Sequence, residues 1–564
     1  MDLVVRGGTL VDGTGAPPRT ADVGIADGKV VAVGKVDGPA ARTIDADGAL
    51  VTPGWVDIHT HYDGQVTWDP TLAPSTWHGV TTAVVGNCGV GFAPVRPGAE
   101  KFLIELMEGV EDIPGTALAE GIDWRWESFP EYLDALDQLP LAIDVGTQVP
   151  HGAVRAYVLG ARASDREYEP TDAELAEMSR LVREGVEAGA LGFSTSRTFL
   201  HKDVHGEFMP GTFAGRRELT ALTDGLAAAG HGVLEVVSDH LHEDEEWAWI
   251  RAFCEATGRP ATLVNTSPAA YQDDLILKLT DRAQADGLRV HPQVAGRPTG
   301  VLHGLQSSFH VFVFNPVYRE IAKLPLAERV AVLGDPAFKA RLLEAGAADG
   351  SNDRWALMLW KVFPLGERPD YEPPKEHSVA GQATAQGRAP LDLMYDLLVA
   401  DGGSELFYQP LGLYDNYEFD FFERAISNEH VVFGLSDGGA HCGVIADAGM
   451  PTFVLTHWAR DRTRGAQFPI ERIVSKLTRE TARTYGISDR GTLEPGMLGD
   501  VNVIDFDNLR MHRPEAVYDL PAGGRRLVQH VDGYRYVVKR GEPIVVDGAD
   551  TGARPGALVR GGAR

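Results

Sequence analysis

Cysteine is scarce in this chain of 564 residues, which contains only Cys88, Cys254 and Cys442. An odd and sparse set does not form a disulfide framework, and it is typical of a protein in a reducing compartment. The start of the chain also lacks a basic segment followed by an apolar core and a cleavage site. We therefore expect a cytoplasmic protein.

Excess positive charge and long apolar runs are also absent. The formal net charge is −28 and the pI is near 5.0, whereas nucleic acids and anionic membranes are bound by basic surfaces. No run approaches the roughly 20 apolar residues of a membrane-spanning helix. The sequence therefore predicts neither nucleic acid nor membrane as a partner. A small-molecule substrate remains possible, because a single local arginine is enough to bind a small anion.

The two ends of the chain contain short β-type runs separated by turn dipeptides, such as Asp12-Gly13 and Asp547-Gly548. This pattern is typical of small antiparallel strands joined by tight turns. Because chain termini often lie close together, we expect residues 1–50 and 488–564 to pair in one small β-sandwich. Exposed sandwich edges often pair with one another, which leaves a homo-oligomer open.

Residues 51–487 alternate apolar strand-like runs with helical segments, as a parallel βα architecture requires. Eight runs qualify as strands, the number that closes a TIM barrel: 51–59, 81–87, 142–149, 190–196, 232–240, 261–267, 288–294 and 431–437. Residues 295–430 are too many for one loop, and we interpret them as an inserted lid over the strand ends. The predicted fold class is α/β: a (β/α)8 TIM barrel, a small β-sandwich from both chain ends and a long insertion after strand seven.

The first predicted barrel strand ends in His59-Thr60-His61. In an extended strand alternate side chains point the same way, so both imidazoles reach together beyond the strand end. Two neutral imidazoles held in this way form half of a zinc site. A pair of surface histidines is the alternative, but the preceding run 51–55 reads as a buried strand entry.

Other polar residues stand at the carboxyl ends of predicted strands, where TIM barrels carry out their chemistry. Cys88 follows strand two, His240 ends strand five and Asp437 ends strand eight. With the two histidines they make a borderline-soft ligand set suited to Zn²⁺. Cys88 could instead be a small buried hydrophobe, and Asp437 a turn or N-cap residue. His151 ends strand three, where it either binds substrate or is structural.

Seven short segments carry a resemblance to a known family: 7–13, 53–61, 86–94, 151–155, 189–194, 436–438 and 491–496. The most specific of them contains Gly86-Asn87-Cys88-Gly89. Together they resemble the amidohydrolase superfamily and, within it, the N-acyl-D-amino-acid deacylases (D-aminoacylases), along nearly the whole chain. The resemblance implies a zinc-dependent hydrolase of amide bonds.

Lysine is scarce in the region where many relatives in this superfamily bridge two metals with a carbamylated lysine. Lys101 is the only lysine between Lys35 and Lys202, and it lies well beyond a strand end. The resemblance therefore implies that Cys88 takes the bridging or anchoring role, which points away from the hydantoinase and dihydroorotase branches. It also implies histidine ligands after strands five and six. His240 can serve for the first, but residues 263–268 contain no histidine, so the site holds one zinc ion firmly, or two with one weakened.

The resemblance further implies that an N-acyl-D-amino acid is hydrolysed to a carboxylate and a free amino acid. Zinc activates water in such sites, and Asp437 would act as general base and then as general acid. Arg197 and Arg297 are candidates for binding the substrate carboxylate, although each also suits a structural ion pair. Two alternatives remain: a cyclic amide, lactone or other acyl substrate at the same centre, and a non-catalytic scaffold.

Overall fold

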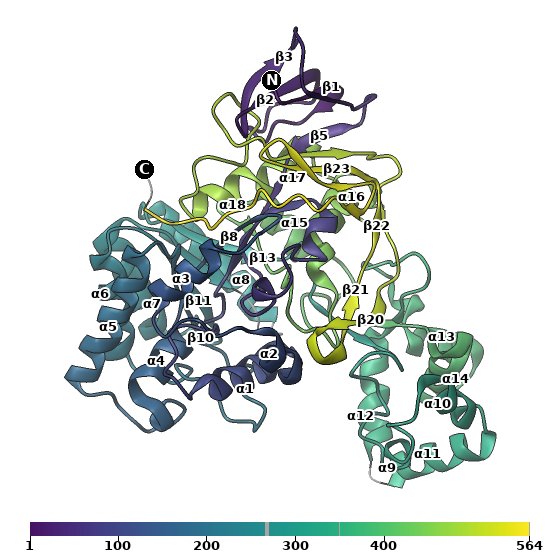
Figure 1. Ribbon diagram of the computed structural model, residues 1–564. Helices are drawn as coiled ribbons and strands as arrows, with labels where there is room; N and C mark the ends of the chain where they lie inside the picture. Colours follow the sequence, from purple (N-terminus) through teal and green to yellow (C-terminus); the bar gives the residue numbers. More distant parts are fainter. Residues whose placement is uncertain (265–269, 349, 563–564) are drawn as a thin grey trace.

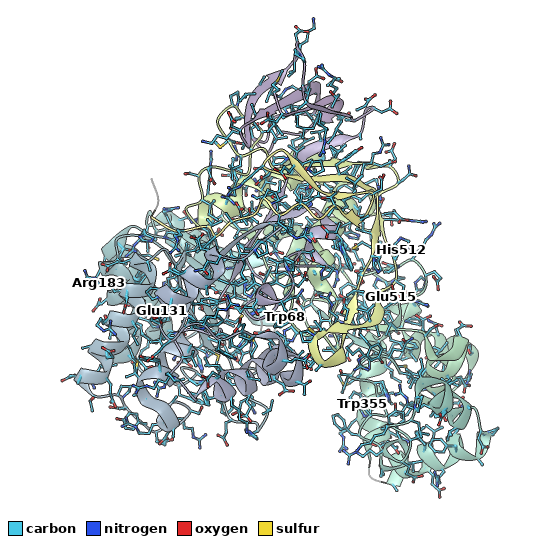
Figure 2. All side chains as sticks on the ribbon, viewed as in Figure 1. Trp68, Glu131, Arg183, Trp355, His512 and Glu515 are labelled. Carbon is cyan, nitrogen blue, oxygen red and sulfur yellow. The ribbon has the colours of Figure 1, made fainter. Side chains whose placement is uncertain are left out.

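The computed structural model describes residues 1–264, 270–348 and 350–562, which form an α/β structure (Figure 1). Parallel strands and helices make the central body, with a β-rich part beyond one end and a helical lobe beside it. Charged side chains such as Glu131 and Arg183 point outwards from the helices (Figure 2). None of the helices in the described ranges has both the length and the apolar character needed to cross a membrane.

The parallel strands follow the order of the chain in two sheets. One sheet contains β6 (Trp55–Asp57), β7 (Val80–Val85) and β8 (Asp144–Thr147). The other contains β9 (Val149–Pro150), β10 (Gly192–Arg197), β11 (Val233–Ser238), β12 (Ala261–Val264), β13 (Val290–Val294) and β17 (Val432–Phe433). The predicted α/β class is therefore confirmed, and each of the eight predicted runs contains a strand. The end of the sixth run, 265–267, lies outside the described residues.

Hydrogen bonds connect the two parallel sheets at both edges. β8 and β9 belong to one run of chain, and the backbone N–H of Leu191 donates to the carbonyl of Thr147 at 2.8 Å, beside β10. At the opposite edge Thr60 forms a parallel bridge with Gly438, and the N–H of His61 donates to the Gly438 carbonyl at 2.8 Å. The chain segments that follow β6 and β17 are therefore neighbours.

Helices flank these strands. A parallel sheet needs cover on both faces, and strands such as β7 are accordingly buried along their whole length. α5 begins with a capping box in which Thr171 and Glu174 satisfy each other's backbone N–H groups. The helices of this part are α1 (Glu100–Glu111), α2 (Gly115–Gly121), α3 (Phe129–Asp137), α4 (His151–Leu159), α5 (Asp172–Glu187), α6 (Arg216–Ala228), α7 (Asp244–Thr257), α8 (Ala270–Ala285), α15 (Asp420–Ser427), α16 (Met450–Thr456), α17 (Ile470–Leu477) and α18 (Arg479–Thr484).

Both chain ends contribute to a single nine-stranded sheet. Its strands are β1 (Leu3–Leu10), β2 (Arg19–Ala26), β3 (Lys29–Gly34), β4 (Arg42–Asp45), β5 (Leu50–Pro53), β18 (Val501–Ile504), β23 (Tyr534–Lys539), β24 (Glu542–Val546) and β25 (Ala549–Asp550). The two ends meet where β5 pairs antiparallel with β18. The first predicted barrel strand is thus divided, because its beginning, Val51–Pro53, lies in this sheet and only Trp55–Asp57 joins β7. Two short hairpin-like pairs extend the C-terminal part: β19 (Arg510–Met511) with β22 (Val531–Asp532), and β20 (Glu515–Leu520) with β21 (Gly524–Val528).

A buried charge cluster joins the nine-stranded sheet to the parallel strands. Asp144 of β8 accepts from Arg490 at 2.5 Å and lies 2.9 Å from Nζ of Lys539, which belongs to β23. Lys539 also donates to Asp500 at 2.7 Å. Although burial opposes ionisation, these cations hold the pKa of Asp144 well below its usual range. The cluster fixes how the two parts pack together.

Residues 295–430 contain a small sheet and a helical lobe with its own hydrophobic core, which includes Phe312, Leu342 and Met394. The sheet consists of β14 (Gly300–His303), β15 (Phe363–Pro364) and β16 (Phe407–Pro410). The helices of the lobe are α9 (Pro316–Arg319), α10 (Leu326–Leu333), α11 (Pro336–Ala348), α12 (Ser351–Met358), α13 (Val379–Gln386) and α14 (Pro390–Val399), at the lower right of Figure 1. The inserted segment is thus a folded unit, and its role as a lid stays a prediction.

Candidate metal centre

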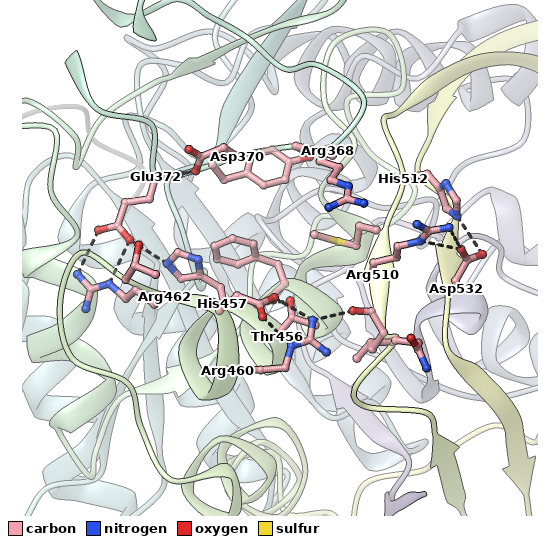
Figure 3. Close-up of a pocket in the computed structure, with 18 of the residues that line it drawn as sticks. Arg368, Asp370, Glu372, Thr456, His457, Arg460, Arg462, Arg510, His512 and Asp532 are labelled. Carbon is pink, nitrogen blue, oxygen red and sulfur yellow. Dashed lines mark hydrogen bonds and ion pairs between the residues drawn. The ribbon is translucent and has the colours of Figure 1, made fainter. Parts of the chain in front are cut away.

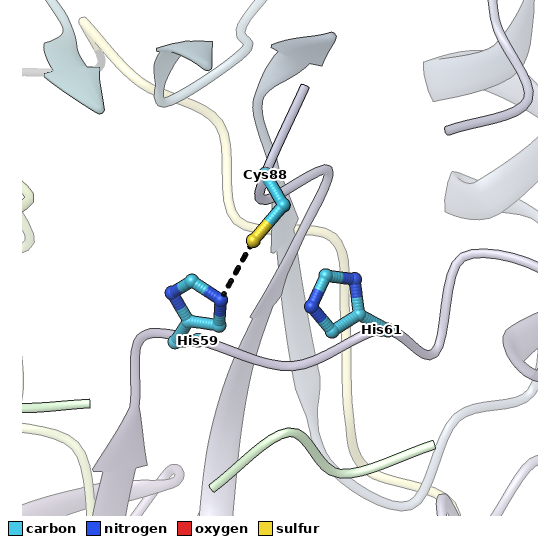
Figure 4. Close-up of side chains that lie close together, drawn as sticks. All are labelled: His59, His61 and Cys88. Atoms are coloured by element: carbon cyan, nitrogen blue, oxygen red, sulfur yellow. Dashed lines mark hydrogen bonds between the residues drawn. The ribbon is translucent and has the colours of Figure 1, made fainter. Parts of the chain in front are cut away.

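Three predicted ligands, His59, His61 and Cys88, converge in the interior (Figure 4). Their ligand atoms all lie within 4.8 Å of one another, and Nε2 of His59 lies 3.3 Å from Sγ of Cys88. All three side chains are buried. The cluster lies just beyond the ends of β6 and β7, as the strand-end argument predicts.

Local backbone geometry aims these side chains inward. A carboxylate oxygen of Asp57 accepts from the backbone N–H of His59 at 3.3 Å and holds the turn that follows β6. Cys88 adopts a left-handed conformation with a φ of 53°, which is uncommon for a residue other than glycine. Its N–H donates to Oε1 of Glu235 on β11 at 3.2 Å. A contact from the other parallel sheet therefore holds the backbone of Cys88, whose thiol faces His59.

Asp437 joins the three residues from the loop after β17. Its Oδ1 atom lies 3.6 Å from Nε2 of His59 and 3.9 Å from Nε2 of His61. The N–H of Asp437 donates to the carbonyl of His59 at 3.2 Å, so the two segments are tied together directly at the site. The structure thus brings together four of the five predicted metal ligands.

The second nitrogen of each histidine faces a polar group behind it. Nδ1 of His59 lies 2.9 Å from Oε1 of Gln293 and 3.5 Å from Glu235. Nδ1 of His61 lies 3.4 Å from Oε1 of Glu111. An acceptor at Nδ1 favours the tautomer with a proton there, which leaves Nε2 unprotonated and facing the cluster. This is the form in which imidazole binds a metal ion.

Buried acids surround the cluster. Burial raises the pKa of Asp437 and of Glu235 to about 8 each, with repulsion between neighbouring carboxylates adding to the effect. Burial also raises the pKa of Asp63 to about 7 and that of the Cys88 thiol well above its usual value. A cation among these groups would favour their ionised forms. The electrostatics of the site therefore suit a bound metal ion.

The spacing of the ligand atoms is close to that around a tetrahedral zinc ion. Two ligand atoms about 2.1 Å from one such ion lie about 3.4 Å apart. The observed separations are 3.3 Å for Cys88 and His59, 3.6 Å for His59 and Asp437, and 3.9 Å for His61 and Asp437. The ligand atoms of one thiol and two imidazoles lie close enough together to reach a single zinc ion after side-chain adjustments, and Oδ1 of Asp437 stands beside both imidazoles.

The fifth predicted ligand, His240, lies apart from the cluster. Its Nδ1 atom is 2.9 Å from Oε1 of Glu243, its ring packs edge-on against Phe199, and its side chain is 20% exposed. β11 ends at Ser238, so His240 belongs to the following turn and strand alternation does not direct it inward. The residue that β11 does direct into the site is Glu235.

The three predicted substrate-binding residues are all held by buried carboxylates of the chain. His151 lies between Thr195 at 2.8 Å and Glu218 at 2.9 Å. Arg197 donates to Glu246 at 2.8 Å. Arg297 donates to Asp447 at 2.7 Å and stacks on the ring of Tyr371 at 3.8 Å. Their surroundings give each of them a packing role, and their role towards substrate stays a prediction.

Several polar residues at the site were not expected from the sequence: Glu111, Gln293, His201, Glu235 and His441. Nδ1 of His201 forms a hydrogen bond with the hydroxyl of Ser196 at 2.8 Å. Burial, together with the charges of the nearby His441 and His59, lowers the pKa of His201 to about 3. A lone carboxylate in the apolar strand 233–238 is a signal that could have identified Glu235, since a buried charge needs a partner. Glu111 and His441 carry no such local signal.

A surface cavity with a volume of about 1040 Å³ lies elsewhere in the structure. Figure 3 shows its charged lining, in which Glu372 binds His457 at 3.0 Å and Arg462 at 3.1 Å. Asp532 similarly binds Arg510 at 2.8 Å. None of the four converging ligands lines this cavity. The metal chemistry is therefore separate from it.

The chain is similar to known proteins along its whole length. The model of the amidohydrolase family matches residues 42–545. An uncharacterised protein of Mycobacterium tuberculosis is 31% identical over 100% of this chain and 92% of its own length, and a D-aminoacylase of Alcaligenes xylosoxydans xylosoxydans is 27% identical over 99% and 97%. A solved D-aminoacylase structure shares the fold, with a TM-score of 0.65 and 23% identity over 99% of both chains. The chain belongs to the amidohydrolase family and is a hydrolase of amide C–N bonds.

Proposed function

We propose that this protein is a zinc-dependent deacylase that hydrolyses N-acyl-D-amino acids to a carboxylate and a free amino acid. The observation that carries the proposal is the convergence of His59, His61, Cys88 and Asp437. The similarity to a D-aminoacylase along nearly the whole chain supports the substrate class. A deacylase of N-acyl-D-glutamate from the same organism, 34% identical over 43% of this chain, supports it further.

Asp437 moves the proton in the proposed reaction. Its Oδ1 atom faces Nε2 of both histidines, so it stands beside the position of the ion, where it accepts a proton from water. It then returns the proton to the leaving amine as a general acid. When bound, a zinc ion supplies Lewis acidity, which lowers the pKa of water towards neutrality and polarises the scissile carbonyl.

The same proposal includes the architecture around the site. The two parallel sheets are interpreted as two arcs of one (β/α)8 barrel, supported by the hydrogen bond of Leu191 to Thr147 and the bridge of Thr60 to Gly438. Residues 1–50 and 488–564 are interpreted as a β-sandwich domain, and 51–487 as the barrel domain with 295–430 as a lid. In such a barrel the four ligands stand at the carboxyl ends of strands, where the chemistry is expected.

The test begins with zinc content, measured by mass spectrometry on protein purified without chelator. We expect about one zinc ion per chain, the number that one tetrahedral site holds. The zinc-loaded protein is then assayed with matched N-acetyl-D- and N-acetyl-L-amino acids, a hydantoin and a lactone. Release of free D-amino acids supports the proposal. Turnover of the cyclic amide or lactone alone favours the alternative substrate class, and a folded protein without zinc would leave only a scaffold.

A further inference from the structure

Glu111, the last residue of α1, is a buried carboxylate that lies between two histidines. Its Oε1 atom is 3.4 Å from Nδ1 of His61, and its Oε2 atom is 3.5 Å from Nε2 of His441. The Glu111 side chain is only 2% exposed. Oε1 of Glu111 and Nδ1 of His61 have no hydrogen-bond partner among the described residues, although they face each other. A modest movement of either group is enough to form the bond.

The backbone around Glu111 holds the loop that follows Asp437. The carbonyl of Glu111 accepts a hydrogen bond from the N–H of His441, and a carboxylate oxygen of Asp112 accepts from the N–H of Gly443 at 3.2 Å. An added Cβ at Gly443 would lie 2.9 Å from the same Asp112 carboxylate, so the two segments are in close contact. The end of α1 therefore holds the loop that follows the proposed general base.

We propose that Glu111 is a positioning residue for the metal centre. It accepts from Nδ1 of His61, which turns Nε2 of that ring towards the ion, and it holds His441 in the loop that follows Asp437. Because the two contacts use different oxygens of one carboxylate, Glu111 sets the distance between the His-x-His segment and the loop of the general base. This inference rests on the proposed metal centre, and it assigns a function to a helix end outside the barrel strands.

The burial of Glu111 explains why it needs both histidines. A carboxylate that is removed from water without partners is strongly disfavoured, and contacts with two imidazole nitrogens offset that cost. Acceptors behind metal-bound histidines orient the ring and increase its basicity, and their loss typically costs about 10- to 100-fold in metal affinity or activity. His59 already has such acceptors in Gln293 and Glu235. Glu111 gives His61 the equivalent contact.

The test compares Glu111→Gln with Glu105→Gln, which makes the same charge change on the same helix. Glu105 contacts Lys101 at 3.2 Å and the exposed His205 at 3.6 Å, not a proposed metal ligand. The readouts are the zinc dissociation constant from competition with a chelator and the visible absorption of the cobalt-substituted protein. We expect Glu111→Gln to weaken zinc binding by about 10- to 100-fold and to shift the cobalt bands. Glu105→Gln should leave both unchanged.

Each outcome separates this inference from the proposed function. If the wild-type protein binds no zinc, the proposed metal centre itself fails. If it binds zinc and Glu111→Gln retains the same dissociation constant and cobalt spectrum, only the positioning role is overturned. Should Glu111→Gln not fold, Glu111→Asp keeps the charge but shortens the reach. A folded Asp variant with weaker zinc binding supports the role, and one with unchanged binding overturns it.

Discussion

Sγ of Cys88 lies 3.3 Å from Nε2 of His59, in the interior of the protein. This contact predicts that the thiol anchors the metal ion. Because a thiolate is a softer ligand for zinc than a hydroxyl group, Cys88→Ser should weaken zinc binding by more than about 100-fold, beyond the loss of an outer-shell partner. The measurement is a zinc dissociation constant by chelator competition.

Cys254→Ser is the matched control for that prediction. Cys254 is also buried, but it lies in α7 and outside the metal cluster. Its substitution should leave the zinc dissociation constant unchanged, even if it lowers the melting temperature. Equal zinc binding by Cys88→Ser and the wild-type protein would contradict the anchoring role.

Asp437→Asn tests the proposed general base. The amide keeps the shape of the side chain but cannot accept the proton, and such a loss typically lowers the rate by about 10²- to 10⁴-fold. Since Asp437 is also a candidate ligand, kcat is measured at saturating zinc and the bound zinc is quantified in parallel. Asp420→Asn, at the exposed start of α15, should retain the wild-type kcat. A zinc-loaded Asp437→Asn enzyme with full kcat would rule out this role.

His240→Ala separates the observed geometry from the strand-end prediction. Nδ1 of His240 lies 2.9 Å from Glu243, whose side chain is 52% exposed, and contacts of this kind contribute at most about 1 kcal/mol. We therefore expect zinc content and stability close to those of the wild-type protein. His61→Ala, measured beside it, should lose most of its zinc. Loss of zinc in His240→Ala would return this histidine to the ligand set.

The sequence was sufficient to predict the α/β class because parallel strands such as β7 and β11 are short, mostly apolar runs that alternate with helical segments. It was not sufficient to assign residues 51–53, which pair with β18 about 450 positions later along the chain. Local composition is the same for a strand in either sheet. Only the partner strand, which is distant in sequence, decides where those residues belong.

Some residues of the candidate site could likewise be predicted from the sequence, and others could not. His59, His61, Cys88 and Asp437 each follow a predicted strand, so the strand-end rule is enough to select them as candidate ligands, although the same rule also selects His240. Glu111 reaches the site from the end of a helix, and its contacts arise only from tertiary packing. No local rule marks a helix-terminal glutamate as an acceptor for a histidine. Residues that support a site are therefore harder to predict than residues that form it.

Glu218 provides a prediction for stability, because its buried carboxylate binds both His151 and Arg155. Burial alone would raise the pKa of Glu218, but these hydrogen bonds outweigh it and lower the pKa from 4.5 to about 2. The folded-state pKa is thus below the ordinary value, so the stabilisation is present above pH 4.5 and is lost as the pH falls towards 2. Glu218→Gln leaves the buried Arg155 without its counter-charge.

We expect Glu218→Gln to lower the free energy of unfolding by about 3–5 kcal/mol at pH 7, the usual cost of breaking a buried pair. The difference from wild type should shrink as the pH falls below 4.5, because the carboxylate of the unfolded wild-type chain is protonated first, while the folded one keeps its charge until about pH 2. Urea unfolding at several pH values measures both effects. Glu177→Gln, which removes a half-exposed partner of Arg180, should cost less than about 1 kcal/mol. A pH-independent difference for Glu218→Gln would mean that packing, and not the charge of this pair, stabilises the region around His151.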